Sequence, residues 1–228
     1  MALYAIGDLH LSLSSNKPMD VFCPAWDNHV ERLKDAIAEL KDDDVTVLCG
    51  DLSWGSSLEE SLQDFRFIDA LPGRKIVLKG NHDYWWNTAT KMRKFFAENG
   101  ITTIEILFNN CFFYGDYAIC GTRGWFYEED QQAHDEKVLN REVMRLETSL
   151  AAAGEKEILC FLHYPPLYQG YRCPEVMAAL QKAGVKRCCY GHLHGPTHKR
   201  ALEGVHEGID FSLIAADYLK FIPKKICD

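Results

Sequence analysis

Five short stretches of the sequence carry side chains that can bind metal ions or move protons. The most informative is 79–83, which reads Lys-Gly-Asn-His-Asp and directly follows an apolar run at 76–78. Asn81 offers a carbonyl oxygen to a hard cation, and His82 can donate or accept a proton near neutral pH. Gly80 permits a tight turn or a close approach of the backbone to a ligand. The other four stretches also follow apolar runs, and they contain Asp8 with His10, Asp51, His163, and His192 with His194.

The donors in these stretches predict a site for two metal ions. They are oxygen or imidazole groups, with no thiolate among them: Asp8, His10, Asp51, Asn81, His163, His192 and His194. In an extended segment, residues i and i+2 point the same way, so each pair spaced by two is expected to face one site. Such a set exceeds the three or four ligands of one zinc ion and suits two divalent ions about 3.5–4 Å apart that share a carboxylate. Imidazole mixed with carboxylate favours Mn, Fe, Zn, Co or Ni over Ca.

Each stretch taken alone also has a structural explanation. A Gly-Asp pair after a strand is commonly a turn, and His163 before two prolines could be a buried polar residue. Packing explains Gly191-His-Leu-His-Gly195 less easily, and all five stretches in this order favour a functional site. The remaining histidines are interpreted as structural or surface groups: His29, His134, His198 and His206. For His198, a contact with substrate is kept open as an alternative.

The three stretches in the first half of the chain, at Asp8, Asp51 and Asn81, are expected at one edge of a parallel sheet. Apolar runs predict strands at 3–6, 45–49 and 75–78, and helical periodicity predicts helices at 26–40, 58–71 and 88–99. Alternation of strand and helix implies a parallel sheet with right-handed crossovers. Ligands of such sheets collect outside the carboxyl ends of the strands.

The second half of the chain predicts a second, partly antiparallel sheet. Gly115 and Asp116 have the composition of a two-residue hairpin turn. The expected strands are 101–104, 111–114, 117–120, 158–162 and 186–190, with two more in the tail 199–226, and helices are expected within 128–153 and at 174–183. No repeat or linker interrupts the chain, so residues 1–228 are expected to form a single domain.

Composition narrows the partners and the compartment. A net charge of −8 without a long basic block disfavours binding to a nucleic-acid backbone, although it does not exclude it. No apolar run reaches the ~18 residues of a membrane span, and a strand that begins by Leu3 leaves no room for a signal peptide. Most of the nine cysteines lie in apolar runs, as reduced core residues do. We therefore expect a cytoplasmic protein without a membrane partner.

The five stretches, in this order, resemble the motifs of the calcineurin-like metallophosphoesterase superfamily between residues 8 and 194. The resemblance implies a four-layer αββα sandwich, in the α/β class, with two mixed β-sheets flanked by helices. It also implies that His82 is a catalytic histidine that binds no metal, and that Asp51 bridges the two ions. One ion would take Asp8, His10, Asp51 and His194, and the other would take Asp51, Asn81, His163 and His192.

One departure from the superfamily pattern separates this chain from the protein serine/threonine phosphatases. Their second motif continues as Gly-Asp-x-x-Asp-Arg-Gly, whereas here Trp54 replaces the second Asp, which partners the catalytic histidine there, and no Arg follows. The resemblance is therefore to a bacterial-type phosphohydrolase, and it leaves open what orients His82. Arg123 is a candidate for the missing substrate-binding charge, with a surface loop Arg as the alternative.

The predicted activity is hydrolysis of phosphomonoesters or phosphodiesters by a metal-bridging hydroxide, with His82 as acid or charge stabiliser. Small phosphoesters and nucleotides are the expected substrates, because Trp54 replaces the Asp and no Arg follows. Aromatic residues that flank the motifs could stack a base, with packing within the loops as the alternative role. Two alternatives remain open. A non-catalytic scaffold of the same fold would bind a protein partner, and a nuclease of the same superfamily would need a basic groove. The sequence leaves the oligomeric state open.

Overall fold

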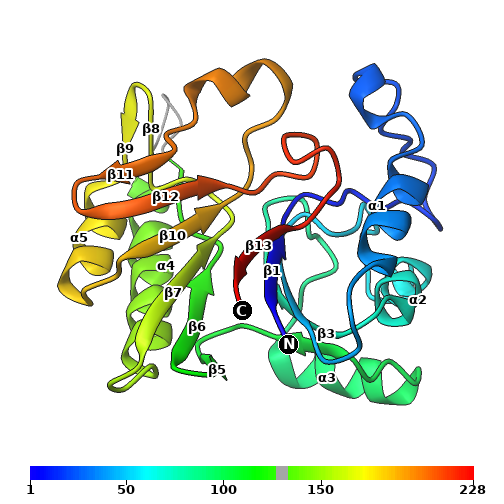
Figure 1. The fold of residues 1–228 in the computed structure, drawn as a ribbon, viewed down its shortest axis with the longest axis horizontal. Helices are drawn as coiled ribbons and strands as arrows, with labels where there is room; N and C mark the ends of the chain where they lie inside the picture. The colour runs from blue at the N-terminus through cyan, green and yellow to red at the C-terminus, as the bar shows by residue number, and fades with distance from the viewer. Residues whose placement is uncertain (127–132) are drawn as a thin grey trace.

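The first sheet contains the three strands expected in the first half of the chain. In the computed structural model, which describes residues 1–126 and 133–228 and no side chains of 133–135, four parallel strands follow the order β1-β2-β3-β4. A fifth strand, β13, pairs antiparallel with β1 at the edge (Figure 1). The bounds are β1 Leu3–Ile6, β2 Val45–Cys49, β3 Arg74–Leu78, β4 Ile104–Ile106 and β13 Lys224–Cys227.

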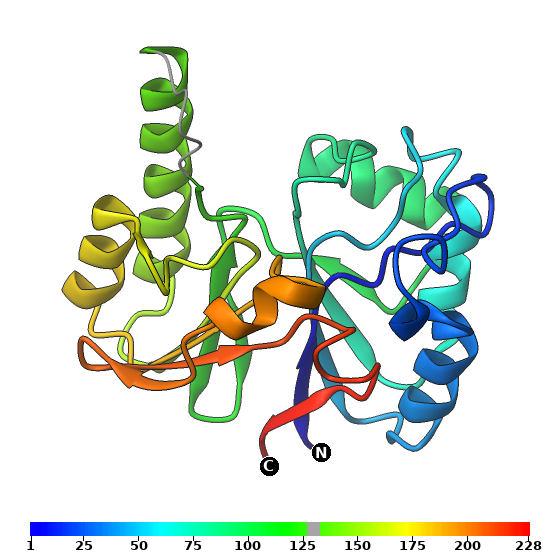
Figure 2. The same ribbon diagram turned by 90° about the horizontal axis from the view of Figure 1, so that it is seen from above.

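Three helices cover the outer face of this sheet (Figure 2). They are α1 (His29–Ala38), α2 (Leu62–Ala70) and α3 (Ala89–Glu98), and a short 3-10 helix at Pro24–Trp26 precedes α1. The side chain of Thr88 caps α3 by accepting a hydrogen bond from the backbone N–H of Lys91. Gly100, with φ of +71°, ends the helix in a conformation that favours glycine. Among the described residues, no helix is long and apolar enough to cross a membrane.

The second sheet has parallel strands at its centre and antiparallel strands at both edges. Its order is β11-β12-β10-β7-β6-β5, in which β6, β7, β10 and β12 are parallel. The predicted two-residue turn is confirmed, because Tyr114 of β5 pairs directly with Tyr117 of β6. The bounds are β5 Phe112–Tyr114, β6 Tyr117–Thr122, β7 Glu157–Leu162, β10 Arg187–Tyr190, β11 Gly204–His206 and β12 Ile209–Leu213. Helices α4 (Ala133–Ala151) and α5 (Pro174–Lys182) cover its outer face, and the expected helical residues 128–132 lie outside the described residues.

The alternation of side chains along the strands produces four layers. Val47 of β2 and Phe161 of β7 meet in a buried cluster between the two sheets. Their neighbours face outward, so that Leu48 packs under α1 and α2, and Cys160 packs under α4 and α5. Both strands are buried on both faces over nearly their whole length, as expected for parallel strands covered by helices. The predicted αββα sandwich of two mixed sheets is confirmed.

One strand prediction was wrong about the sheet, and one strand was missed. The run 101–104 was expected in the second sheet, but the strand is β4, and it pairs parallel with β3 in the first. The tail adds the two expected strands, β11 and β12, to the second sheet, and a third strand that was not predicted, β13, pairs with the edge of β1. Pairing of distant segments, rather than local composition, decides both cases. A small hairpin of β8 (Leu167–Tyr168) and β9 (Tyr171–Arg172), and a 3-10 helix at Gly195–Arg200, were not predicted.

Candidate metal centre

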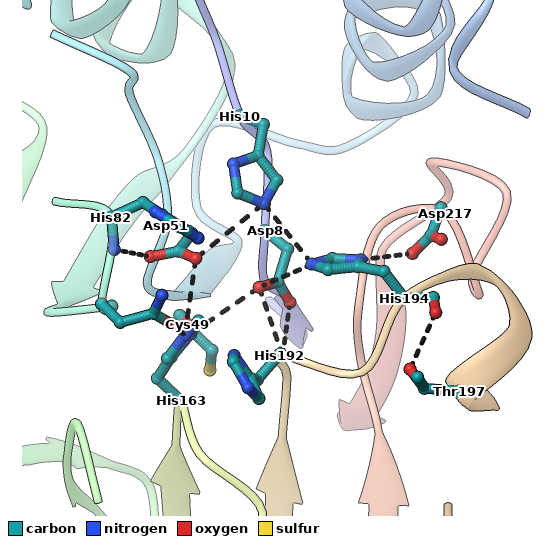
Figure 3. A network of polar contacts seen from close by, with 12 residues as sticks. Asp8, His10, Cys49, Asp51, His82, His163, His192, His194, Thr197 and Asp217 are labelled. Atoms are coloured by element: carbon teal, nitrogen blue, oxygen red, sulfur yellow. Dashed lines mark hydrogen bonds and ion pairs between the residues drawn. The ribbon is translucent and has the colours of Figure 1, made fainter. Parts of the chain in front are cut away.

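The carboxyl ends of strands from both sheets meet at one end of the sandwich. Backbone hydrogen bonds tie these ends together: Asp8 N donates to Gly50 O at 2.8 Å, and Gly191 N donates to His163 O at 3.1 Å. Gly7 N also donates to Ile214 O at 2.7 Å, which joins β1 of the first sheet to the end of β12 in the second. The loops after β1, β2, β3, β7 and β10 therefore share one site, where the side chains of Asp8, His10, Asp51, His163 and His194 point toward one another (Figure 3).

The first group of donors lies where β1 meets the loop after β10. His194 Nε2 is 3.4 Å from Asp8 Oδ1 and 3.4 Å from His10 Nε2. His10 Nε2 also lies 3.9 Å from Asp51 Oδ2. Asp8 and His10 are buried, and the ligand atoms of Asp8, His10 and His194 all lie within 4.8 Å of one another. This spacing is that of side chains able to share one cation.

The second group surrounds His163, which is fully buried. Its Nε2 lies 2.6 Å from Asn81 Oδ1 and 3.5 Å from Asp51 Oδ2. The ring of His192 is 5.2 Å from that of His163, centroid to centroid. Asp51 Oδ2 thus lies between the two groups, near His10 on one side and His163 on the other. The structure brings all seven predicted ligands together, and Asp51 has the place expected of a shared carboxylate.

Hydrogen bonds fix the tautomers of two of the histidines. His163 Nδ1 is 3.0 Å from the carbonyl oxygen of Cys49, which can only accept, so Nδ1 carries the proton. In the same way, His194 Nδ1 faces the Asp217 carboxylate at 2.9 Å. When each ring is neutral, its Nε2 therefore carries the lone pair and faces the other donors. This is the arrangement that metal-ligating histidines adopt in proteins.

The backbone of the site is strained. Asp8, His10, Asp51 and His192 have φ between +46° and +71°, a region that residues other than glycine seldom occupy. The expectation that paired ligands face the site from extended segments was therefore wrong for Asp8, His10 and His192, which left-handed turns aim instead, whereas His194 has an extended backbone. Each left-handed residue costs of order 1–3 kcal/mol, and clusters of them occur at functional sites.

Two glycines make room for the carboxylates. A Cβ on Gly80 would overlap Asp51 Oδ1 and Asp51 N, and a Cβ on Gly191 would overlap Asp8 Oδ2. Neither glycine has a positive φ, so close approach rather than backbone freedom explains both. The glycines of the third and fifth stretches thus have a direct steric role beside the two aspartates.

Burial and neighbouring charges shift the pKa values of several donor groups at the site. Burial and the neighbouring charge of Asp8 raise the pKa of Asp51 to about 8. Burial and the ring of His163 lower the pKa of His192 to about 3. For Asp8, burial opposes ionisation, yet the charges of His194, His163 and His10 lower its pKa to about 2. Divalent cations would supply the positive charge that lets both aspartates ionise, so the donor set fits the predicted metals.

His82 stands beside the donors without joining them. Its ring lies 4.6 Å from the ring of Trp54, centroid to centroid, and its Nδ1 is 3.5 Å from the hydroxyl of Tyr84. Its backbone N–H donates to Asp51 Oδ1 at 2.7 Å. Trp54 also stacks on His10 at 4.9 Å. An indole and a phenol therefore surround His82. The carboxylate partner that the protein phosphatases have is replaced by the indole of Trp54.

Two aspartates with structural roles at the site were missed from the sequence. Asp83 is fully buried and accepts hydrogen bonds from Asp51 N at 2.9 Å, Leu52 N at 2.9 Å and Gly80 N at 2.7 Å. Asp217, from the loop after β12, contacts His194 and accepts from Gly195 N at 3.0 Å. Asp83 lies inside a recognised motif, whereas nothing in the residues around Asp217 distinguishes it.

Arg123 is engaged by an acidic partner. Its Nη2 lies 3.6 Å from Oε1 of Glu142, a carboxylate that is 2% exposed and that also pairs with Arg145. Thr122 Oγ1 donates to the other oxygen of Glu142 at 3.1 Å. Arg123 therefore has a structural partner on α4, and its predicted contact with substrate stays a prediction.

The fold and the cluster of donors support a metal-dependent phosphoesterase in general. Residues 1–196 match the family described as calcineurin-like phosphoesterase. The chain belongs to this family, as its motifs predicted. No protein among curated sequences matches the chain.

Solved structures of low sequence identity share the fold. Phosphopantetheinyl hydrolase (PptH) from Mycobacterium tuberculosis is 14% identical, with a TM-score of 0.59, and the match covers 99% of this chain and 95% of that one. The protein of unknown function AQ665 from Aquifex aeolicus is 16% identical, with a TM-score of 0.53 and coverage of 98% and 95%. TT1561 from Thermus thermophilus is 12% identical, with a TM-score of 0.53 and coverage of 84% and 81%. These likenesses extend the fold assignment over nearly the whole chain.

Proposed function

We propose that this protein is a phosphohydrolase that acts on small phosphoesters with two divalent transition-metal ions. One observation supports this most directly: the ionisable and amide groups of five loops converge, and hydrogen bonds leave Nε2 of both His163 and His194 facing Asp51 or Asp8. When bound, such ions lower the pKa of a water molecule and offset the charge of a phosphate. Mn, Fe, Zn, Co and Ni all suit the donor types.

The proposed division of the ligands follows the two groups of donors. Asp8, His10 and His194 would hold one ion, and Asn81, His163 and His192 would hold the other, with Asp51 shared. The 2.7 Å bond from His82 N to Asp51 Oδ1 supports a separate role for the His82 ring. Its backbone is fixed by a ligand while its side chain extends toward Trp54 and Tyr84. We assign to His82 the transfer of a proton to the leaving oxygen.

The surroundings of His82 favour small substrates over phosphoproteins. The protein phosphatases combine a carboxylate beside the catalytic histidine with a phosphate-binding arginine. Here Trp54 takes the place of the carboxylate, and Arg123 pairs with Glu142. One structural neighbour is a phosphopantetheinyl hydrolase, so a phosphopantetheinyl phosphodiester belongs in any substrate panel. The likeness to that enzyme supports the fold and does not select the substrate.

The test measures metal content and activity on the same preparation. Protein purified without chelator, or reloaded with Mn²⁺, should hold more than one metal ion per chain by elemental analysis. It should hydrolyse 4-nitrophenyl phosphate or bis(4-nitrophenyl) phosphate faster than a phosphoserine protein. A loaded protein without activity on any ester would support the scaffold alternative. A chain that refuses Mn²⁺ would refute the site itself.

A further inference from the structure

The loop after β1 places a lysine beside the proposed catalytic histidine. Leu13 N donates to Asp64 Oδ1 at 2.8 Å, and Met19 accepts a hydrogen bond at its sulfur from Trp54 Nε1 at 3.2 Å. Trp54 N in turn donates to Leu11 O at 2.9 Å. The loop is thus tied down on both sides of Lys17, whose side chain remains exposed. Anchored ends limit the positions that this lysine can take.

The ammonium of Lys17 lies 5.2 Å from the centroid of the Trp54 ring. A cation over an indole face is attracted by the ring, which holds the charge near its observed place. The same indole lies 4.6 Å from the ring of His82. Lys17 and His82 therefore contact one side chain, and that side chain occupies the position of the missing carboxylate.

This charge is available to a ligand. Among the side chains that the structure describes, none of the carboxylates pairs with Lys17, whereas Arg123 is paired with Glu142. An exposed ammonium beside the group that serves the leaving oxygen suits a leaving group that is itself anionic. A carboxylate at position 54 would have attracted Lys17 and cancelled this charge; the indole keeps it in place without neutralising it.

We infer that Lys17, held over Trp54, binds a second phosphate attached directly to the scissile one, so that the preferred substrate is a phosphoanhydride. This inference rests on the proposed phosphohydrolase function and extends its substrates from phosphoesters to phosphoanhydrides. In the reaction, water oxygen forms a bond to the attacked phosphorus. The bond from that phosphorus to the bridging oxygen breaks, and the bridging oxygen leaves with the second phosphate. One proton of the water is released, and no oxidant or reductant takes part.

Binding of two stable anions to the Mn²⁺-loaded protein tests this inference without turnover. Calorimetry would compare methylenediphosphonate, which has two linked phosphonates, with inorganic phosphate, which has one group. Lys17→Ala should weaken the diphosphonate about 10-fold or more, because a charge-assisted contact is lost. Lys17→Ala should leave the affinity for phosphate close to that of the wild type. Lys17→Arg should restore the affinity for the diphosphonate. High salt should reduce the advantage of the diphosphonate in wild type, since the lysine is exposed.

Lys94→Ala is the matched control, because Lys94 is an exposed lysine of α3 that pairs with Glu98. It removes the same charge and should change neither affinity. Equal weakening of both anions by Lys17→Ala, or no weakening of either, would overturn the inference. Manganese content measured after each titration would show that the diphosphonate has not removed the metal. Failure of the proposed function itself would appear separately, as a loaded wild-type protein that does not hydrolyse 4-nitrophenyl phosphate.

Discussion

The carboxylate of Asp217 lies 2.9 Å from Nδ1 of His194 and turns the Nε2 of that ring toward Asp8 and His10. Asp217 is 2% exposed at its side chain, and it also holds Gly195 N at 3.0 Å and faces His198 Nε2 at 3.2 Å. Burial opposes ionisation of Asp217, but His194 and His198 together lower its pKa. The geometry is that of a carboxylate orienting a metal-ligating histidine.

Removal of this carboxylate should weaken metal binding without unfolding the protein. Loss of such an orienting partner typically reduces metal affinity about 10–100-fold, and we expect this range for Asp217→Ala. Calorimetric titration of the chelator-treated protein with Mn²⁺ would measure this affinity. Asp217→Asn keeps an oxygen acceptor for the ring and should retain more affinity than the alanine variant. Asp210→Ala, an exposed acid on β12, is the control. Unchanged Mn²⁺ affinity in Asp217→Ala would show that His194 does not depend on Asp217.

Asp83 should matter to stability as much as to metal binding. Besides three backbone N–H groups, it accepts from Trp85 Nε1 at 2.9 Å, so one buried carboxylate satisfies four buried donors. Asp83→Ala would leave these donors without a partner, and we expect a loss of about 3–5 kcal/mol in the free energy of unfolding. Urea unfolding of the metal-free protein would measure this. Asp116→Ala, at a fully exposed turn, should change little. A loss no larger than that of the control would contradict a clamping role for Asp83.

The sequence located the donor residues that meet at the candidate site because local rules govern their placement. Each donor follows an apolar run, and parallel strands gather their carboxyl ends at one edge. Asp217 follows Ala215 and Ala216, and no local pattern marks it as a partner of a residue 23 positions away. The left-handed φ values of Asp8 and Asp51 could not be predicted either, because neither is a glycine and only the assembled site holds them there.

The same difference between local sequence patterns and contacts made only in the assembled fold explains the errors in the fold prediction. Strands β1, β2 and β3 were predicted from hydrophobic runs, and their parallel direction followed from the helices between them. Strand β13 lies at the edge of β1, although the two strands come from opposite ends of the chain, and only the tertiary fold decides that pairing. The assignment of ligands to two separate ions also stays a prediction, because it depends on where the cations lie.

Asp51 should be more important for metal content than Asp8. Asp51 Oδ2 lies near ligand atoms of both groups, at 3.9 Å from His10 Nε2 and 3.5 Å from His163 Nε2. Asp51→Ala should therefore reduce binding of both ions, whereas Asp8→Ala should mainly affect the one held by His10 and His194. Elemental analysis of both variants, purified without chelator, would compare them, and circular dichroism would check the fold. Equal metal content in the two variants would argue against a bridging carboxylate.

His82 should serve the leaving group rather than the metal ions. Positioned proton transfer contributes typically ~10²–10⁴-fold, and the gain depends on how much the leaving oxygen needs a proton. His82→Ala should therefore keep both ions and lose much more rate on an alkyl phosphoester than on a nitrophenyl ester, whose phenolate leaves unprotonated. Equal losses on the two substrates would indicate charge stabilisation instead of acid catalysis. Loss of metal would show that His82 is a ligand.

The pH dependence of the rate gives a second readout of the same role. Burial, followed by the charges of His163 and His194, lowers the pKa of His82 below its ordinary value of 6.5, and bound cations would lower it further. An acid must carry its proton before the reaction, so kcat on the alkyl ester should fall as the pH rises through this lowered pKa. That fall should be absent in His82→Ala. Tyr84→Phe removes the hydroxyl 3.5 Å from Nδ1 and leaves the ring in place, so it should shift the fall without abolishing it. A rate that still falls over the same pH range in His82→Ala would assign the titration to another group.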